Sequence, residues 1–152
     1  MNLKKSLPVL AVALIAAYVA SLGCNKVSSS SGGGSNTPLS QVANNSTVTL
    51  SSASVGSTTF TGGGPGEGLS ETAPCGGCSS GFLAVAVGTN TIVVTPQGSS
   101  PVTVGTLGPF LVGNTYEVNI TNGYCAQLYQ RLQTNTPPNQ DSTKRLIAST
   151  CP

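Results

Sequence analysis

The chain has 152 residues, of which 7% are charged, and it contains no histidine. A length of this order holds one domain rather than two, and soluble domains ordinarily have roughly a quarter of their residues charged. Apart from Lys4 and Lys5, the four remaining cationic side chains equal the four carboxylates in number. No basic face can form from them, which excludes a nucleic-acid partner, and the absence of histidine excludes a serine–histidine nucleophile.

The first 23 residues are typical of an export leader. Lys4 and Lys5 precede an almost unbroken apolar run over residues 7–20, and small residues surround a cleavage point at 21–23. The run is shorter than the roughly 20 residues that a membrane-spanning helix needs, and polar sequence follows it directly. The pattern predicts a signal peptide over residues 1–23.

The residues Ser21-Leu22-Gly23-Cys24 resemble the lipobox of bacterial lipoproteins. That family prefers leucine where this chain has Ser21. The resemblance implies acylation of Cys24 by fatty acids such as palmitate, and attachment of the exported chain to the bacterial cell envelope, at the outer membrane or cell surface. Ordinary signal cleavage is the alternative and gives a secreted protein. Five cysteines less one leave an even number for disulfide bonds, which favours acylation.

Residues 24–38 form the predicted tether. The stretch is rich in glycine and serine and has no apolar periodicity, so we expect a flexible coil. About 14 residues of such a coil have a typical reach of about 20 Å. The tether therefore places the following domain just clear of a membrane surface.

From Ser46 onward, apolar and polar residues alternate with the period of two that is typical of half-buried strands. The alternation is clear at Val48 and Leu50, over residues 83–87, at Ile92 and Val94, at Val102 and Val104, and over residues 116–121. Turns are predicted at 88–90, 96–100 and 121–123. Residues 126–132 fit either period, and we favour a strand; another strand is expected over Arg145–Ser149. About seven short strands predict a single all-β sandwich over residues 39–152.

The stretch GFLAVAVGTNTIVVTPQGSSPV, together with LVGNTYEVNIT, resembles the repeat unit of the domain-of-unknown-function 4397 family. The resemblance covers residues 82–129. It implies an immunoglobulin-like β-sandwich of the kind found in bacterial surface proteins and lipoproteins. The family pattern marks no catalytic residue.

Residues 61–80 are rich in glycine. The segment lacks the Gly-Lys-Ser/Thr ending of a phosphate-binding loop, so we interpret it as a mobile surface loop. Because such loops often carry binding function, we expect partner contact here, at Gly62, Gly63, Gly64, Pro65, Glu67 and Glu71.

Cys75 and Cys78 form a Cys-x-x-Cys motif that has three interpretations. A thiol oxidoreductase places this motif at a helix N-terminus, but strand sequence follows it here. A zinc site with Cys125 and Cys151 lacks a second closely spaced pair. We favour structural disulfides, Cys75 with Cys78 and Cys125 with Cys151.

These features predict a non-catalytic surface module, structural, adhesive or partner-binding, that needs no metal or cofactor. Its expected partners are the membrane, through the lipid on Cys24, and a protein or surface glycan; low charge also permits self-association. The alternative is an exported thiol–disulfide or metal-handling protein that uses Cys75 and Cys78. Stable disulfides favour the first hypothesis, and a reactive thiol or a bound metal favours the second.

Overall fold

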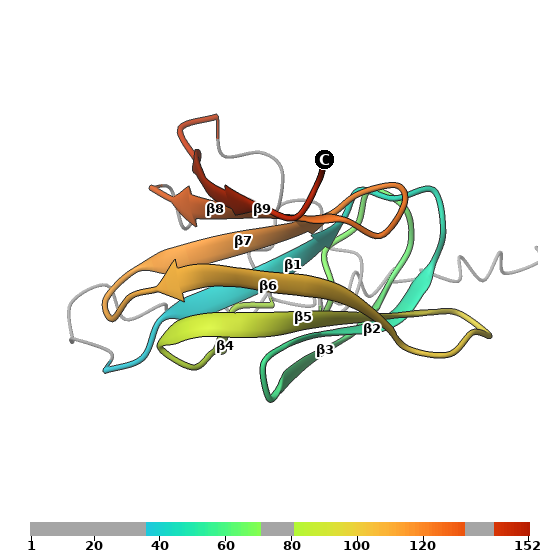
Figure 1. Ribbon diagram of the computed structural model, residues 1–152, viewed down its shortest axis with the longest axis horizontal. Coiled ribbons are helices and arrows are strands. Elements are labelled where there is room, and N and C mark those ends of the chain that lie inside the picture. The colour runs from blue at the N-terminus through green and yellow to red at the C-terminus, as the bar shows by residue number, and fades with distance from the viewer. Residues whose placement is uncertain (1–35, 71–80, 133–141) are drawn as a thin grey trace, which may run out of the picture.

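The computed structural model describes residues 36–70, 81–132 and 142–152, which form nine strands (Figure 1). The strands are β1 (Leu39–Asn44), β2 (Leu50–Val55), β3 (Thr58–Gly63), β4 (Leu83–Ala84), β5 (Gly88–Pro96), β6 (Val102–Phe110), β7 (Thr115–Ile120), β8 (Ala126–Arg131) and β9 (Arg145–Ser149). Within these three segments, no helix is long and apolar enough to cross a bilayer.

The strands form two sheets that pack face to face (Figure 1). One sheet has five strands in the order β4-β1-β7-β8-β9, and the other has four in the order β3-β2-β5-β6. Strand β1 pairs in parallel with β7, whereas all other strand pairs are antiparallel. The predicted all-β sandwich is confirmed.

The core lies between the sheets and is built from alternate residues of each strand, because successive side chains point to opposite faces. Val42, Val118 and Leu128 share one register across β1, β7 and β8 and face inward. The buried apolar cluster comprises Val42, Leu50, Ala53, Val55, Phe60, Leu69, Val85, Ile92, Val94, Leu107, Phe110, Tyr116, Val118, Ile120, Ala126 and Leu128.

Tyr116 connects the turn between β6 and β7 to the core through contacts with Phe110 and Leu111. Its side chain is buried, and its ring contacts Phe110 edge to face, with 4.9 Å between the ring centroids. Its hydroxyl accepts a hydrogen bond of 2.9 Å from the backbone N–H of Leu111. Tyr116 therefore joins the sheets at this turn by packing and by one partly buried hydrogen bond.

We predict that Tyr116→Phe lowers the free energy of unfolding by about 1 kcal/mol, because one partly buried hydrogen bond is lost while the ring contacts remain. Urea unfolding measures the change. Tyr124→Phe is the control, since no hydrogen bond of the Tyr124 hydroxyl is found in the described part of the chain. Equal effects of the two variants would contradict this role of Tyr116.

Strand β1 lies before the point at which the sequence predicts the first strand. Its outward- and inward-facing side chains are both covered, so its residues do not alternate between apolar and polar. Asn44 is buried and satisfied, because its amide donates to the carbonyl oxygens of Val48 and Gly63 at 2.8 and 3.0 Å. Because buried polar residues interrupt the alternation of apolar and polar side chains, a strand such as β1 is not recognised from that alternation.

The predicted turn at residues 88–90 is wrong, because these residues begin β5. Asn90 is 5% exposed, and its amide donates to the carbonyl oxygen of Ala86 at 2.9 Å. The expected strand over residues 83–87 is correspondingly short and ends at Ala84. By contrast, the strands predicted at residues 126–132 and 145–149 are confirmed as β8 and β9.

Candidate functional site

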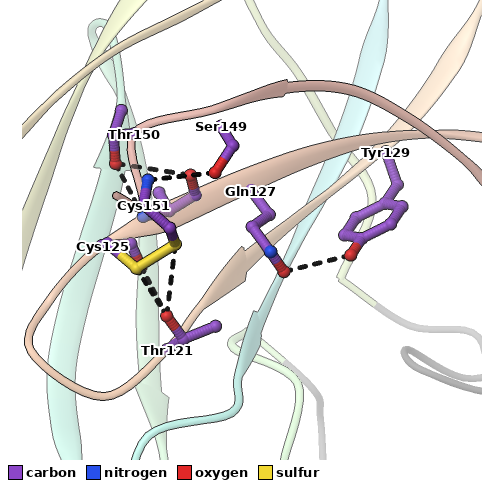
Figure 2. The surroundings of a disulfide bond; sticks show 8 residues. Thr121, Cys125, Gln127, Tyr129, Ser149, Thr150 and Cys151 are labelled. Carbon is purple, nitrogen blue, oxygen red and sulfur yellow. Dashed lines mark hydrogen bonds between the residues drawn. A yellow bond between two sulfur atoms is a disulfide. The ribbon is translucent and has the colours of Figure 1, made fainter.

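A disulfide bond joins Cys125, just before β8, to Cys151, just after β9 (Figure 2). The two residues are 26 positions apart in the chain, and their Cα atoms are 4.9 Å apart. This is the pair that we expected from the sequence. It closes the end of the chain onto the five-stranded sheet.

Backbone geometry holds the two cysteines in place. Thr150 donates from its N–H to the carbonyl oxygen of Ala126 at 2.8 Å, and its hydroxyl accepts from the N–H of Ala126 at 2.9 Å. On the other side, the Thr121 hydroxyl lies 2.8 Å from the Cys125 sulfur (Figure 2). The last residues of the chain are therefore fixed by hydrogen bonds as well as by the disulfide.

The predicted turn at residues 121–123 is confirmed, and it aims Cys125 toward Cys151. The N–H of Thr121 donates to the carbonyl oxygen of Cys125 at 2.9 Å. Gly123 and Tyr124 both have a positive φ, of 77° and 54°, a region that glycine adopts freely and tyrosine rarely. This left-handed pair reverses the chain between β7 and β8.

The glycine-rich segment follows a defined path as far as residue 70. Gly62 and Gly63 are the last residues of β3. Gly64 donates from its N–H to the carboxylate of Glu67 at 2.7 Å, and the N–H of Glu67 donates back to the carbonyl oxygen of Gly64 at 3.1 Å. Pro65, between them, is exposed at the tip of this turn.

The same segment is hydrogen-bonded along β1. The N–H of Gly66 donates to the carbonyl oxygen of Asn44 at 2.6 Å. The N–H of Asn44 in turn donates to the carbonyl oxygen of Glu67 at 2.8 Å. Leu69 is fully buried, and its N–H donates to the carbonyl oxygen of Val42 at 2.8 Å. The predicted loop is therefore wrong for residues 61–63, which end β3 and pair with β2, whereas residues 64–70 follow a hydrogen-bonded path beside β1.

Two of the predicted sites lie at the same end of the sandwich. Asn44, Ile120 and Ala126 are aligned across β1, β7 and β8. The turn at Gly64–Glu67 is bonded to Asn44, and the disulfide adjoins Ala126. Cys24, Cys75, Cys78 and Glu71 lie outside the described residues.

A buried ionic cluster lies on the outer face of the five-stranded sheet, and the sequence did not predict it. Glu117 is fully buried. One carboxylate oxygen accepts from Lys144 Nζ at 2.6 Å, and the other accepts from Gln41 Nε2 at 3.0 Å. Arg131 Nη1 lies 3.6 Å from the second oxygen. The side chains of Gln41, Glu117 and Arg131 come from three adjacent strands.

Aromatic rings complete the surroundings of this cluster. The Arg131 guanidinium lies 5.5 Å from the centre of the Phe82 ring, and Lys144 Nζ lies 4.7 Å from the centre of the Tyr129 ring. Among the residues that the structure describes, two cations lie against the Glu117 carboxylate, which is held on both oxygens. This arrangement fixes the residues that precede β9 to the centre of the sheet, which is a structural role.

In the described segments, no three carboxylate, cysteine or histidine side chains come together in a group that could hold a metal ion. No family model matches the chain, and neither a curated protein nor a solved structure matches it significantly.

Proposed function

We propose that this chain is an exported, lipid-anchored β-sandwich that serves as a non-catalytic structural or partner-binding module of the bacterial cell envelope. The observation that carries the proposal is the disulfide between Cys125 and Cys151. Disulfides of this kind persist in oxidising compartments and are rare in the cytosol. The leader over residues 1–23 and the lipobox at Cys24 supply the route and the anchor.

Partner binding is assigned in this proposal to the end of the sandwich that carries the disulfide. The turns at residues 64–67, 97–100 and 121–125 all lie at this end, and they present glycine, hydroxyl and amide groups. A rigid sheet that supports short polar turns suits contact with a protein or surface glycan. Membership of the domain-of-unknown-function 4397 family is part of the same proposal.

The proposal predicts that Cys24→Ala releases the protein from membranes. Two or three acyl chains contribute about 0.8 kcal/mol for each buried CH₂ group, far more than the marginal attachment of a single chain. Fractionation of the producing cells measures the effect: the wild-type chain should sediment with membranes and the variant should stay in the supernatant.

Ser28→Ala, in the tether, is the matched control and should sediment like the wild type. A Cys24→Ala chain that still sediments with membranes, or a wild-type chain that does not, would contradict the lipid anchor.

A further inference from the structure

The described chain enters the sandwich at the end opposite the disulfide. The N–H of Leu39 donates to the carbonyl oxygen of Asn114 at 3.1 Å, in the turn between β6 and β7. The N–H of Val85 donates to the carbonyl oxygen of Pro38 at 3.0 Å. The start of β1 therefore lies beside the β6–β7 turn and the segment before β5, at the left of Figure 1.

Large apolar side chains are exposed at this entry end. Val87, Leu111 and Val112 are 54%, 50% and 51% exposed. Gly88, the first residue of β5, pairs with Phe110, the last residue of β6, so Val87 and Leu111 lie just beyond the ends of neighbouring strands. Leu132, which is 66% exposed, directly follows the pairing of Arg131 with Thr115 at the same end.

The other end of the sandwich is different. Of the seven exposed large apolar side chains in the described segments, the four just named lie at the entry end, and Leu146 lies on β9 opposite Tyr129. Val48 and Val102 lie at the other end, at 38% and 37% exposure. The exposed turns around them consist mainly of serine, threonine, asparagine, glutamine and glycine. Monomeric proteins seldom expose grouped apolar side chains without a use for them.

The two exposed charged side chains of the described residues are divided in the same way. Arg145 is exposed and pairs with Gln130, near the entry end. Glu67 is exposed at the opposite end, where its carbonyl oxygen accepts from Asn44. The entry end thus combines apolar tips with a nearby cation, which suits the interface of a bilayer containing anionic lipid.

We propose that the entry end, defined by Val87, Leu111, Val112 and Leu132, docks on the bilayer that holds the lipid anchor. This inference rests on the proposed function. The described residues begin at Asn36, and the proposal takes over from the sequence analysis a tether of about 14 residues with an expected reach of about 20 Å. The anchor therefore keeps this end, rather than the other, at a high effective concentration next to the membrane.

Docking also orients the domain. With the entry end on the lipid surface, the disulfide and the turn at residues 64–67 point away from the membrane. The polar turns then face away from the membrane, where partners can reach them. Docking thereby fixes the orientation of the sandwich relative to the membrane.

The chain contains no tryptophan, so one introduced tryptophan is an unambiguous reporter. The full chain carrying Val112→Trp is purified from host membranes and reconstituted into vesicles of phosphatidylethanolamine and phosphatidylglycerol. Acyl-chain-brominated phosphatidylcholine is then added to the vesicles as a quencher. Val48→Trp, at the opposite end, is the matched control.

The Val112→Trp emission should shift to shorter wavelength on the vesicles and be quenched by the brominated lipid, whereas the Val48→Trp emission should do neither. Adding Val87→Ser and Leu111→Ser to the reporter should lower the docked-to-undocked ratio about tenfold, because two half-exposed apolar side chains lose their burial. Val48→Ser with Val102→Ser should leave that ratio unchanged.

Flotation of the same vesicles separates the two proposals. A chain that floats with the vesicles but whose Val112→Trp emission is not quenched overturns docking and leaves the anchor intact. A wild-type chain that does not float overturns the anchor and this inference with it. A blue shift that grows with protein concentration in the Cys24→Ala background, without vesicles, identifies a second copy as the occupant and also overturns docking on lipid.

Discussion

Replacing Cys125 and Cys151 together with alanine is expected to lower the free energy of unfolding by about 3–4 kcal/mol, because the disulfide closes a loop of 26 positions in the unfolded chain. For a domain of this size the change corresponds to a fall in melting temperature of roughly 10–20 °C. Thermal and urea unfolding of oxidised wild type and variant give both values.

The loss should be largest at the end of the chain. Among the described strands, β9 lies at the edge of its sheet and pairs with β8 alone. The rate of hydrogen exchange should therefore rise more at β9 than at β7. Ser149→Ala is the control, because it removes only the hydrogen bond of 3.0 Å that the Ser149 hydroxyl accepts from the N–H of Cys151. A double variant as stable as the wild type, with unchanged exchange at β9, would show that the disulfide does not hold this strand.

Glu117→Gln is expected to destabilise the domain by about 3 kcal/mol, since it keeps the shape of the side chain but removes the buried carboxylate charge that lies 3.6 Å from Arg131 Nη1. Lys144 loses the same partner, but its side chain is 16% exposed and can reach water. Urea unfolding at neutral pH measures the effect, and circular dichroism checks that the variant keeps its strands.

Two controls separate charge from other causes. Glu67→Gln changes an exposed carboxylate on a turn and should cost less than about 0.5 kcal/mol, as surface substitutions usually do. Lys144→Met keeps Arg131 paired with Glu117 and should cost clearly less than Glu117→Gln. If Lys144→Met proves the more damaging of the two, the buried pair with Arg131 is not the main contribution of the cluster.

The sandwich and most of its strands could be predicted from the sequence because their alternation reports directly on burial. In β7, Tyr116, Val118 and Ile120 alternate with polar residues and face the core. The turn at residues 121–123 could also be predicted from the sequence, since such a turn needs residues that tolerate a left-handed backbone. These features depend on neighbouring residues alone.

The features that were missed depend on residues far apart in the chain. From the strand pattern alone, Glu117 is expected to be exposed. In the structure β1 lies beside β7 and brings Gln41, which is 76 positions away in the chain, into contact with Glu117. The path of the glycine-rich segment likewise depends on β1, which offers hydrogen-bond partners to Gly66 and Leu69. Neither feature could be predicted without β1, whose buried polar residues conceal its period.

The most direct test of the account is the intact mass of the chain extracted from membranes of cells that export it, with Cys24 analysed in the N-terminal peptide. The account predicts a chain that begins at Cys24, carries a diacylglycerol and usually an amide-linked acyl group on that residue, and keeps the disulfide between Cys125 and Cys151. A mature chain that begins elsewhere, or that carries an unmodified Cys24, would contradict it.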